Sequence, residues 1–238
     1  MLKKTILYRV DGGRVWGVSM GHVKRSLITA TALQKTYDVI FVMKNYLDGV
    51  NYVKEKGFKV ETIEIDDNDE FSLTKIAKKY NPKVIVFDLY KTYYNKFFIY
   101  AKKNKIRTVV FDVMGDCIGK PDAVINETFV PQYTKYNFNE SEVDLYIGPK
   151  YFLLNNPPTK ISIKDKIKNV IVTMGGSDPN NLTIKIVKTL KKSNEDYNYN
   201  IVLGPLMDKK NKQQIKKEVY NSPNFTLYDA PKDLLKII

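Results

Sequence analysis

TILYRVDGGRVWGVSMGHVKRSLITATAL, residues 5–33, joins a short apolar run to a glycine-rich turn and then to a segment with apolar residues at helical spacing. We predict a strand over Thr5–Val10 and an amphipathic helix over Val23–Leu33. A strand, a glycine-rich turn and a helix N-terminus form an anion site, because unpaired backbone N–H groups and the positive end of the helix dipole point to one place. This stretch therefore predicts a βα unit with room for a phosphate group.

The only histidine in the chain, His22, lies at the mouth of this predicted helix. An imidazole exchanges protons near neutral pH, so beside a phosphate site it suggests an enzyme that acts on a phosphorylated or nucleotide-linked substrate. The alternative is a histidine that only caps or packs the helix start.

The alternation of strand and helix patterns continues outward from this unit to about residue 155. Strand-like runs rich in Val, Ile and Phe occupy Thr5–Val10, Val39–Met43, Val60–Ile65, Val84–Asp88, Thr108–Asp112, Ala123–Ile125 and Leu145–Ile147. Helical spacing occurs at Val23–Leu33, Tyr46–Lys56, Phe71–Tyr80 and Tyr93–Lys103. Continuously apolar strands that alternate with helices are typical of a doubly wound parallel α/β sheet, which we assign to residues 1–155.

Ligands of such sheets bind at the carboxyl ends of the strands. The polar and glycine residues at or near those ends are Arg9, Asp11, Gly12, Gly13, His22, Asp88, Tyr90, Asp112 and Asn126. Asp11 either braces the glycine turn through its own backbone or orients His22 or a sugar hydroxyl. Asp88 and Tyr90 either cap and pack at the end of their strand or contact a ligand.

A second domain follows a proline-containing linker. Paired prolines in Asn155–Thr159 interrupt both helix and strand, so we place a linker at 156–166 and a second Rossmann-like domain at 167–238. Its predicted strands are Asn169–Met174, Asn200–Leu203 and Phe225–Tyr228, and its predicted helices are Asn180–Lys192, Lys209–Tyr220 and a start at Pro231–Ile238. Three strands and an uncovered apolar end are typical of a truncated domain.

A second candidate phosphate cradle lies in this domain, at Gly175, Gly176, Ser177 and Asp178. Asp178 as N-cap, followed by Pro179 at the first helical position, signals a helix start, and the glycines let the backbone approach an anion. The alternative is a turn without a ligand.

Composition excludes several classes of protein. No run approaches the roughly 18 apolar residues of a membrane span, and there is one cysteine, Cys117, so we expect a cytoplasmic protein without stable membrane insertion. The net charge is +13, but only four of 39 basic residues are arginine and the lysines are spread over the predicted helices, which disfavours nucleic-acid binding. The acidic run Asp66–Glu70 lacks the glycine and distal glutamate of a calcium loop, so we interpret it as a solvated loop and helix start.

Seven ordered blocks of the chain resemble a known family. They are Arg9–Gly13, Met20–Arg25, Asp88–Tyr90, Asp112, Asp122–Asn126, Gly148–Leu154 and Thr173–Thr183. Together they look like the UDP-2,4-diacetamido-2,4,6-trideoxy-β-L-altropyranose hydrolases of pseudaminic acid synthesis and the related spore-coat polysaccharide proteins. These are similar to two-domain GT-B glycosyltransferases. The resemblance implies a GT-B-like fold, with a UDP-sugar bound between two Rossmann-type domains and UDP released from an amino-deoxy sugar.

By this resemblance His22 is the general base that deprotonates the attacking water. From their positions at the same edge of the sheet, we also predict Asp11 and Tyr90 as catalytic residues. The substrate-binding residues that we predict are Arg9, Gly17, Gly21, Arg25, Asp88, Asn126, Gly175, Gly176, Ser177, Asp178 and Asn181. No metal or other cofactor is required, because helix N-termini and glycine-loop amides can hold the diphosphate.

Two departures from the family pattern bear on specificity. The first turn is longer than usual, and Val113 replaces an acidic residue that commonly follows the aspartate at position 112. Three alternatives to the hydrolase remain open: a GT-B glycosyltransferase that uses a UDP-sugar donor, a non-catalytic nucleotide-sugar binding protein, and a fragment whose C-terminal domain is completed by a partner chain or a dimer.

Overall fold

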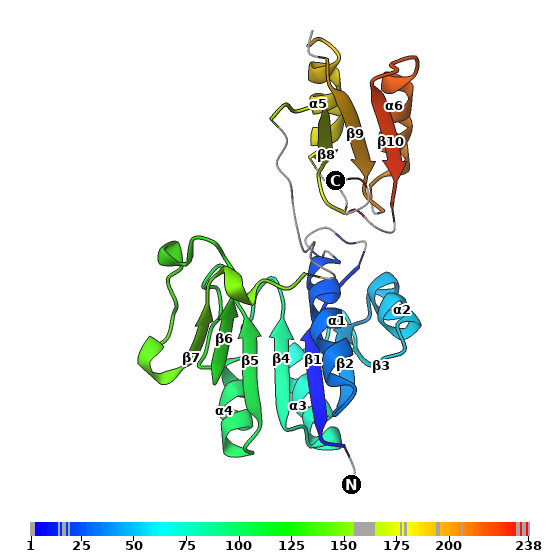
Figure 1. The fold of residues 1–238 in the computed structure, drawn as a ribbon. Helices are drawn as coiled ribbons and strands as arrows, with labels where there is room; N and C mark the ends of the chain where they lie inside the picture. The colour runs from blue at the N-terminus through cyan, green and yellow to red at the C-terminus, as the bar shows by residue number, and fades with distance from the viewer. Residues whose placement is uncertain are drawn as a thin grey trace. The chain divides into compact units, whose positions relative to one another are not determined.

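The computed structural model describes residues 3–13, 15, 18, 20–154, 165–176, 178, 180–193, 196–205, 207–231, 234 and 237 of the 238-residue chain. The chain forms two compact units, Met1–Pro157 and Pro158–Ile238 (Figure 1). Among the described helices, none has the length and apolar composition needed to cross a bilayer.

The first unit is built on a seven-stranded sheet with the order β3-β2-β1-β4-β5-β6-β7 (Figure 1), in which every neighbouring pair is parallel. Its strands are β1 (Thr5–Val10), β2 (Asp38–Lys44), β3 (Lys59–Ile63), β4 (Val84–Asp88), β5 (Arg107–Phe111), β6 (Ala123–Asn126) and β7 (Asp144–Ile147). Its α-helices are α1 (Gly21–Leu33), α2 (Leu47–Glu55), α3 (Asp69–Tyr80) and α4 (Asn95–Lys103). The strand order reverses between β1 and β4, because β2 and β3 lie on one side of β1 and β4 to β7 lie on the other. Ligands bind at such a switch point in doubly wound sheets.

Apolar side chains on both faces of this sheet pack against helices. Leu7 and Phe87 belong to one cluster, which includes apolar residues of α3 and α4. Tyr8 and Phe41 belong to the other cluster, which includes apolar residues of α1 and α2. Because successive residues of a strand point to opposite faces, a strand buried on both sides is apolar at nearly every position. This two-sided burial explains the continuous apolar runs in the sequence.

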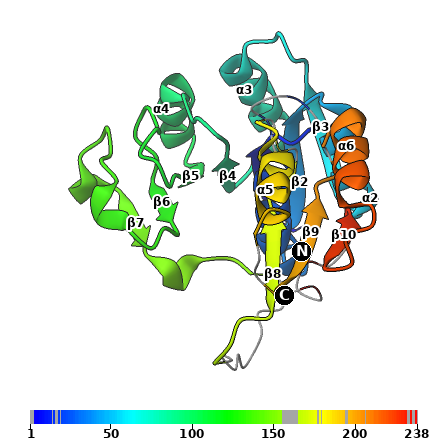
Figure 2. The ribbon, with the colours of Figure 1, turned by 90° about the horizontal axis from the view of Figure 1, so that it is seen from above.

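The second unit has a three-stranded parallel sheet with the order β10-β9-β8. Its elements are β8 (Asn169–Thr173), α5 (Leu182–Leu190), β9 (Asn198–Leu203), α6 (Lys209–Val219) and β10 (Phe225–Asp229). Val187 and Ile215, from α5 and α6, are packed into the core of this unit with Ile201 of β9. Figure 2 shows α5 and α6 beside the strands of this unit. The helix start predicted over Pro231–Ile238 falls largely outside the described residues.

The predicted start of the helix after β8 is wrong by about two residues. The N-cap of α5 is Asn181, with φ +52°, and Asp178 also has a positive φ of +46°. Two residues in the left-handed region cannot belong to a right-handed helix, so α5 begins only at Leu182. Pro179, which we expected at the first helical position, lies outside the described residues.

Candidate active site

The turn after β1 is held in place by two close backbone approaches. A side chain on Gly12 would bring a Cβ within 2.5 Å of Val23 Cγ2 in α1, and one on Gly49 of α2 would come within 1.7 Å of the Gly12 carbonyl oxygen. Glycine is required at both positions because no Cβ fits. Gly12 is therefore fixed between the N-terminal parts of α1 and α2.

Helix α1 has no acidic residue in its first turn within the described part of the chain. Its N-cap, Met20, makes no side-chain hydrogen bond to the helix residues that the structure describes. The positive end of the helix dipole is consequently not neutralised by the helix itself, which favours an anion nearby. His22 is the second residue of this helix.

His22 is bonded to a buried carboxylate at the end of β4. The imidazole Nδ1 lies 2.7 Å from Asp88 Oδ1, and Asp88 is fully buried. Arg25, one turn further along α1, donates from Nε to Asp88 Oδ2 at 2.9 Å and from Nη2 to Oδ1 at 2.5 Å. The hydroxyl of Ser26 also donates to Oδ2, at 3.2 Å. Four donors from α1 thus converge on one carboxylate.

These contacts keep Asp88 ionised. Burial disfavours the charged carboxylate, but the hydrogen bonds and positive charges of Arg25 and His22 outweigh burial and lower the pKa of Asp88 below its usual value. With Asp88 anionic, the hydrogen bond assigns the proton of a neutral His22 to Nδ1, which leaves Nε2 with a free lone pair. The imidazole is partly exposed, at 27%.

Arg25 links this pair to a second acid. Glu127, the residue after β6, accepts from Arg25 Nη1 at 2.5 Å and is itself buried. The Arg25 guanidinium also lies 4.7 Å from the centre of the Phe111 ring. Burial alone would lower the pKa of Arg25, but the pairing with Asp88 and Glu127 raises it well above the ordinary value. Arg25 is therefore a fixed cation between two carboxylates.

A second buried arginine occupies the end of β1. Arg9 is completely buried and donates to both carboxylate oxygens of Asp11, at 2.6 and 2.8 Å, and to both of Asp69, at 2.9 and 2.7 Å. A longer contact of 3.5 Å joins Nη1 to the Val42 carbonyl oxygen. These contacts use all five N–H groups of the guanidinium. Arg9 thus braces the wall of the site and has no donor left for a ligand.

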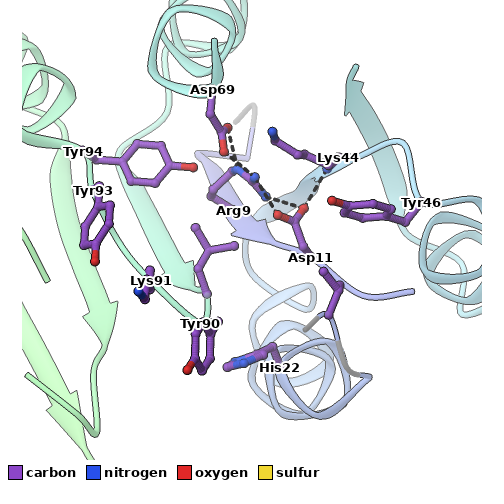
Figure 3. Close-up of a pocket in the computed structure, with 12 residues that line it drawn as sticks. Arg9, Asp11, His22, Lys44, Tyr46, Asp69, Tyr90, Lys91, Tyr93 and Tyr94 are labelled. Atoms are coloured by element: carbon purple, nitrogen blue, oxygen red, sulfur yellow. Dashed lines mark hydrogen bonds and ion pairs between the residues drawn. The ribbon is translucent and has the colours of Figure 1, made fainter. Parts of the chain in front are cut away.

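Between these two networks lies a cavity of about 420 Å³, shown in Figure 3. It is lined by Arg9, Asp11, Val18, His22, Lys44, Tyr46, Asp69, Leu89, Tyr90, Lys91, Tyr93 and Tyr94. We call it the tyrosine cavity, after Tyr46, Tyr90, Tyr93 and Tyr94. Lys91 lies 5.9 Å from the ring centres of Tyr90 and Tyr93. Aromatic faces, cations and carboxylates together suit a polar ring with an anionic substituent.

His22 also lines a second cavity of about 380 Å³, which we call the Glu127 cavity. Its walls are Gly21, His22, Lys24, Arg25, Ile28, Glu127, Phe152 and Leu153. One buried oxygen of Glu127, Oε2, has no hydrogen-bond partner among the described residues. The histidine thus borders two separate spaces.

The structure brings together some of the predicted site residues. Asp11, His22 and Tyr90 line one cavity, and Gly21, His22 and Arg25 line the other. Asp11 does not orient His22, however, because both its carboxylate oxygens accept from Arg9, and Oδ1 also accepts from the Lys44 backbone N–H at 2.7 Å. The orienting carboxylate is Asp88. Gly17 lies outside the described residues.

Asn126 is not at the site. It is fully buried, and its amide donates to the hydroxyls of Thr134 and Tyr136 at 3.1 and 2.9 Å while its oxygen accepts from the Thr128 backbone at 3.0 Å. These contacts hold the loop that follows β6. Asp112 plays a similar part after β5, where it accepts from the backbone of Gly115, Asp116 and Cys117.

In the second unit, the predicted cradle is already occupied by a side chain. The Asp178 carboxylate accepts from the backbone N–H groups of Leu182 and Thr183, at 2.8 and 2.9 Å, and so fills the N-terminus of α5. The Asn181 side chain accepts from Asn211. These two amides at the helix start are therefore unavailable to a phosphate, while Gly175, with φ +71°, and Gly176 lie against Gly204. Ser177 lies outside the described residues.

Sequence reasoning missed several residues of the first unit, among them Lys91, Tyr93 and Tyr94, which follow β4. Asp69 was interpreted as part of a solvated loop, yet it binds Arg9. Lys44 is the last residue of β2, Tyr46 follows that strand, and Glu127 follows β6, at the same edge of the sheet as the residues that were predicted. Position at or after a strand end was therefore a usable signal for these three residues. Asp69 gave none, since its partner lies 60 residues away. No cluster of three or more His, Cys, Asp or Glu side chains suited to a metal ion occurs in the described part of the chain.

No protein-family model matches the chain. It is 32% identical over 203 residues to the uncharacterized protein MJ1062 of Methanocaldococcus jannaschii, across 79% of this chain and 40% of the relative. It is 22% identical over 231 residues to the spore coat polysaccharide biosynthesis protein SpsG of Bacillus subtilis, across 94% of this chain and 66% of SpsG. The chain thus spans less than two thirds of the length of either relative.

Solved structures establish the architecture. MurG of Acinetobacter baumannii matches with a TM-score of 0.62 and 14% identity, over 98% of this chain and 70% of MurG. The UDP-GlcNAc 2-epimerase of Neisseria meningitidis, bound to UDP-GlcNAc, matches with a TM-score of 0.52 and 13% identity, over 98% of this chain and 74% of the epimerase. The chain therefore has a GT-B-like α/β fold with two Rossmann-like units, which confirms the predicted fold class.

Proposed function

We propose that this chain is part of a UDP-sugar-processing enzyme of surface-polysaccharide synthesis in which His22 is the general base. The observation that carries the proposal is the hydrogen bond between His22 Nδ1 and the buried Asp88 carboxylate, at 2.7 Å. A carboxylate that holds Nδ1–H fixes the tautomer in which Nε2 accepts a proton, and it stabilises the imidazolium that then forms. Support comes from the likeness to SpsG and to an epimerase bound to UDP-GlcNAc.

The reaction that we propose is hydrolysis of the bond between the anomeric carbon and the β-phosphate of UDP. His22 Nε2 takes a proton from water as the water oxygen bonds to the anomeric carbon, and the carbon–oxygen bond to UDP breaks with its electron pair leaving on the phosphate. General-base help of this kind contributes roughly 10²–10⁴ in rate. By the family resemblance, the sugar is a 2,4-diacetamido-2,4,6-trideoxy sugar.

Anionic groups of the substrate have three sources of stabilisation in the first unit. These are the N-terminus of α1, Lys91 beside the tyrosines, and Lys44 at the cavity wall. The Lys44 amine already donates to the Ile65 carbonyl oxygen at 2.6 Å, so it acts through its charge and its remaining N–H groups. Arg9 contributes through rigidity, because all of its donors are used.

The Glu127 cavity favours a second candidate function, transfer of the sugar to an acceptor. It borders His22 on its own set of walls, which places a second space beside the imidazole where an acceptor hydroxyl could lie. His22 would then deprotonate that hydroxyl in place of water. The two reactions share the base and differ in the nucleophile.

One experiment distinguishes these candidates. The chain is incubated with a UDP-sugar without acceptor, and UDP release is followed for the wild type and for His22→Asn. A hydrolase releases UDP at a rate that His22→Asn abolishes, whereas a transferase releases little UDP until an acceptor is added. Equal slow release by both proteins would contradict the role of His22.

Calorimetry with UDP tests two further alternatives. One is a non-catalytic binding protein, and the other is a site that is completed by further sequence or by a partner chain. His22→Asn is expected to retain the UDP affinity of the wild type. Binding of UDP without turnover by either protein would support a binding protein. Tighter UDP binding by a version extended to the length of SpsG would support a site completed by further sequence or by a partner chain.

A further inference from the structure

The positive charge of Arg25 lies close to His22 and competes with it for Asp88. Its Nη2 lies 3.5 Å from His22 Nδ1 and donates to the same Asp88 oxygen that the histidine uses. A like charge at this distance disfavours the imidazolium, and a carboxylate already paired with Arg25 attracts the imidazolium less strongly. With Asp88 and Arg25 alone, the two charges nearest to His22 would cancel.

We propose that Glu127 is a positioning residue that cancels the charge of Arg25 and so keeps Asp88 available to hold a proton on His22. This inference rests on the proposed function of His22 as a base, although its test does not require activity. Arg25, Asp88 and Glu127 together carry a net charge of −1, which favours a cation at the neighbouring imidazole.

The geometry of Glu127 fits this role better than that of a structural clamp. Only Oε1 contacts Arg25, at 2.5 Å, while Oε2 is buried without a partner among the described residues. A carboxylate placed to maximise hydrogen bonds would use both oxygens. The charge of Glu127 acts on the adjacent guanidinium at hydrogen-bond distance, and no other described side chain bonds to its carboxylate.

The charged and titratable groups around His22 come from β1, β2, α1, α3, β4 and the residues that follow these strands and β6. The cations are Arg9, Arg25, Lys24, Lys44 and Lys91, and the carboxylates are Asp11, Asp69, Asp88 and Glu127. The titratable tyrosines are Tyr46 after β2 and Tyr90, Tyr93 and Tyr94 after β4. Arg9 with its two partner carboxylates also sums to −1. Among these groups, Asp88 and Arg25 make direct side-chain contacts to His22.

The test uses the fact that His22 is the only histidine. Its proton and carbon resonances at Cε1 are therefore assigned without ambiguity, and the pKa of His22 is measured directly by NMR titration. Glu127→Gln keeps the size of the side chain and an acceptor oxygen for Arg25 but removes the charge. We expect this variant to lower the pKa of His22 by about half a unit or more, and to move the acidic limb of the pH–rate profile by the same amount.

A double variant separates charge from structure. Arg25→Gln alone is expected to raise the pKa of His22, and Arg25→Gln with Glu127→Gln to return it toward the wild-type value. Glu61→Gln, which removes a carboxylate paired with Lys79 and Tyr80 outside both cavities, is the control and should leave the titration unchanged.

The result that overturns the proposal is an unchanged His22 titration in Glu127→Gln, whether or not activity falls. Loss of activity at all pH values with an unchanged titration would assign Glu127 a purely structural role. If none of the proteins turns over a UDP-sugar but the titration shifts as expected, the proposed function fails while the inference about Glu127 stands.

Discussion

His22 and Asp88 lie 66 residues apart in the sequence, yet Nδ1 of the first is 2.7 Å from Oδ1 of the second. The contact exists because α1 follows β1, and β4 is the strand that pairs with β1 on the side away from β2. A helix start and a strand end from two different βα units therefore meet at the switch point of the sheet.

Replacing Asp88 with Asn should reduce turnover by roughly 10²–10⁴, because an amide does not fix the productive tautomer or stabilise the imidazolium. Steady-state UDP release measures the loss, and calorimetry with UDP should show unchanged affinity. Asp144→Asn, in an exposed pair with Arg107, is the control. Wild-type turnover in Asp88→Asn would remove the basis for His22 as the base.

Arg9→Met should destabilise the first unit by about 3–5 kcal/mol, because it leaves two carboxylates without their buried partner. Urea unfolding, followed by circular dichroism, measures the difference. Arg107→Met is a matched control: both partners of its ion pair are more than half exposed, so its loss should cost under about 1 kcal/mol. An equal loss in the free energy of unfolding for the two substitutions would show that the buried ion pairs of Arg9 do not stabilise the first unit.

Acid should weaken the Arg9–Asp69 contact in a predictable direction. Burial raises the pKa of Asp69, but the hydrogen bonds and charge of Arg9 lower it below the ordinary value. A lowered pKa in the folded state contributes stability at pH values above the unfolded value of about 3.9, and this contribution is lost as the pH falls through the folded pKa.

Asp69→Asn should therefore be less stable than the wild type at pH 7, and the difference should narrow as the pH falls below about 4. Urea midpoints measured at several pH values under conditions where both proteins are folded give the comparison. A difference that stays constant with pH would show that the pairing does not shift the titration of Asp69.

Gly49→Ala tests the close approach of α2 to Gly12, because helix propensity and this contact predict opposite changes in the free energy of unfolding. In an unconstrained helix, alanine is more favourable than glycine by about 1 kcal/mol. At position 49 the new Cβ would meet the Gly12 carbonyl oxygen, so we expect destabilisation by roughly 1–3 kcal/mol. We also expect weaker binding of a UDP-sugar, since the turn must move.

Gly57→Ala is the control for this substitution. Gly57 has φ +84° and nothing within 4 Å of a new Cβ, so only backbone strain of about 1–2 kcal/mol is expected, without a change in ligand affinity. An increase in stability for Gly49→Ala would refute the close approach of α2 to the turn.

The sequence alone predicted most of the architecture. Each predicted strand of the first unit overlaps an observed one, and β1 and β4 match to the residue, because parallel strands buried on both faces must be apolar throughout. The positions of Asp11, His22, Asp88 and Tyr90 at one edge of the sheet followed from the same rule. The α5 start was predicted less well, since positive φ angles at Asp178 and Asn181 are not visible in a pattern of residue types.

Tertiary structure alone decided what each polar side chain at that edge does. Local sequence places a residue at a strand end, but its partner is chosen by strand order, which brings together groups 60 to 102 residues apart: Arg9 with Asp69, His22 with Asp88, Arg25 with Glu127. Electrostatic pairing depends on distance in space, and distance in space depends on the strand order, in which β4 lies beside β1. The chain's amino acids thus determined where the site lies, and its fold determined which carboxylate holds the histidine.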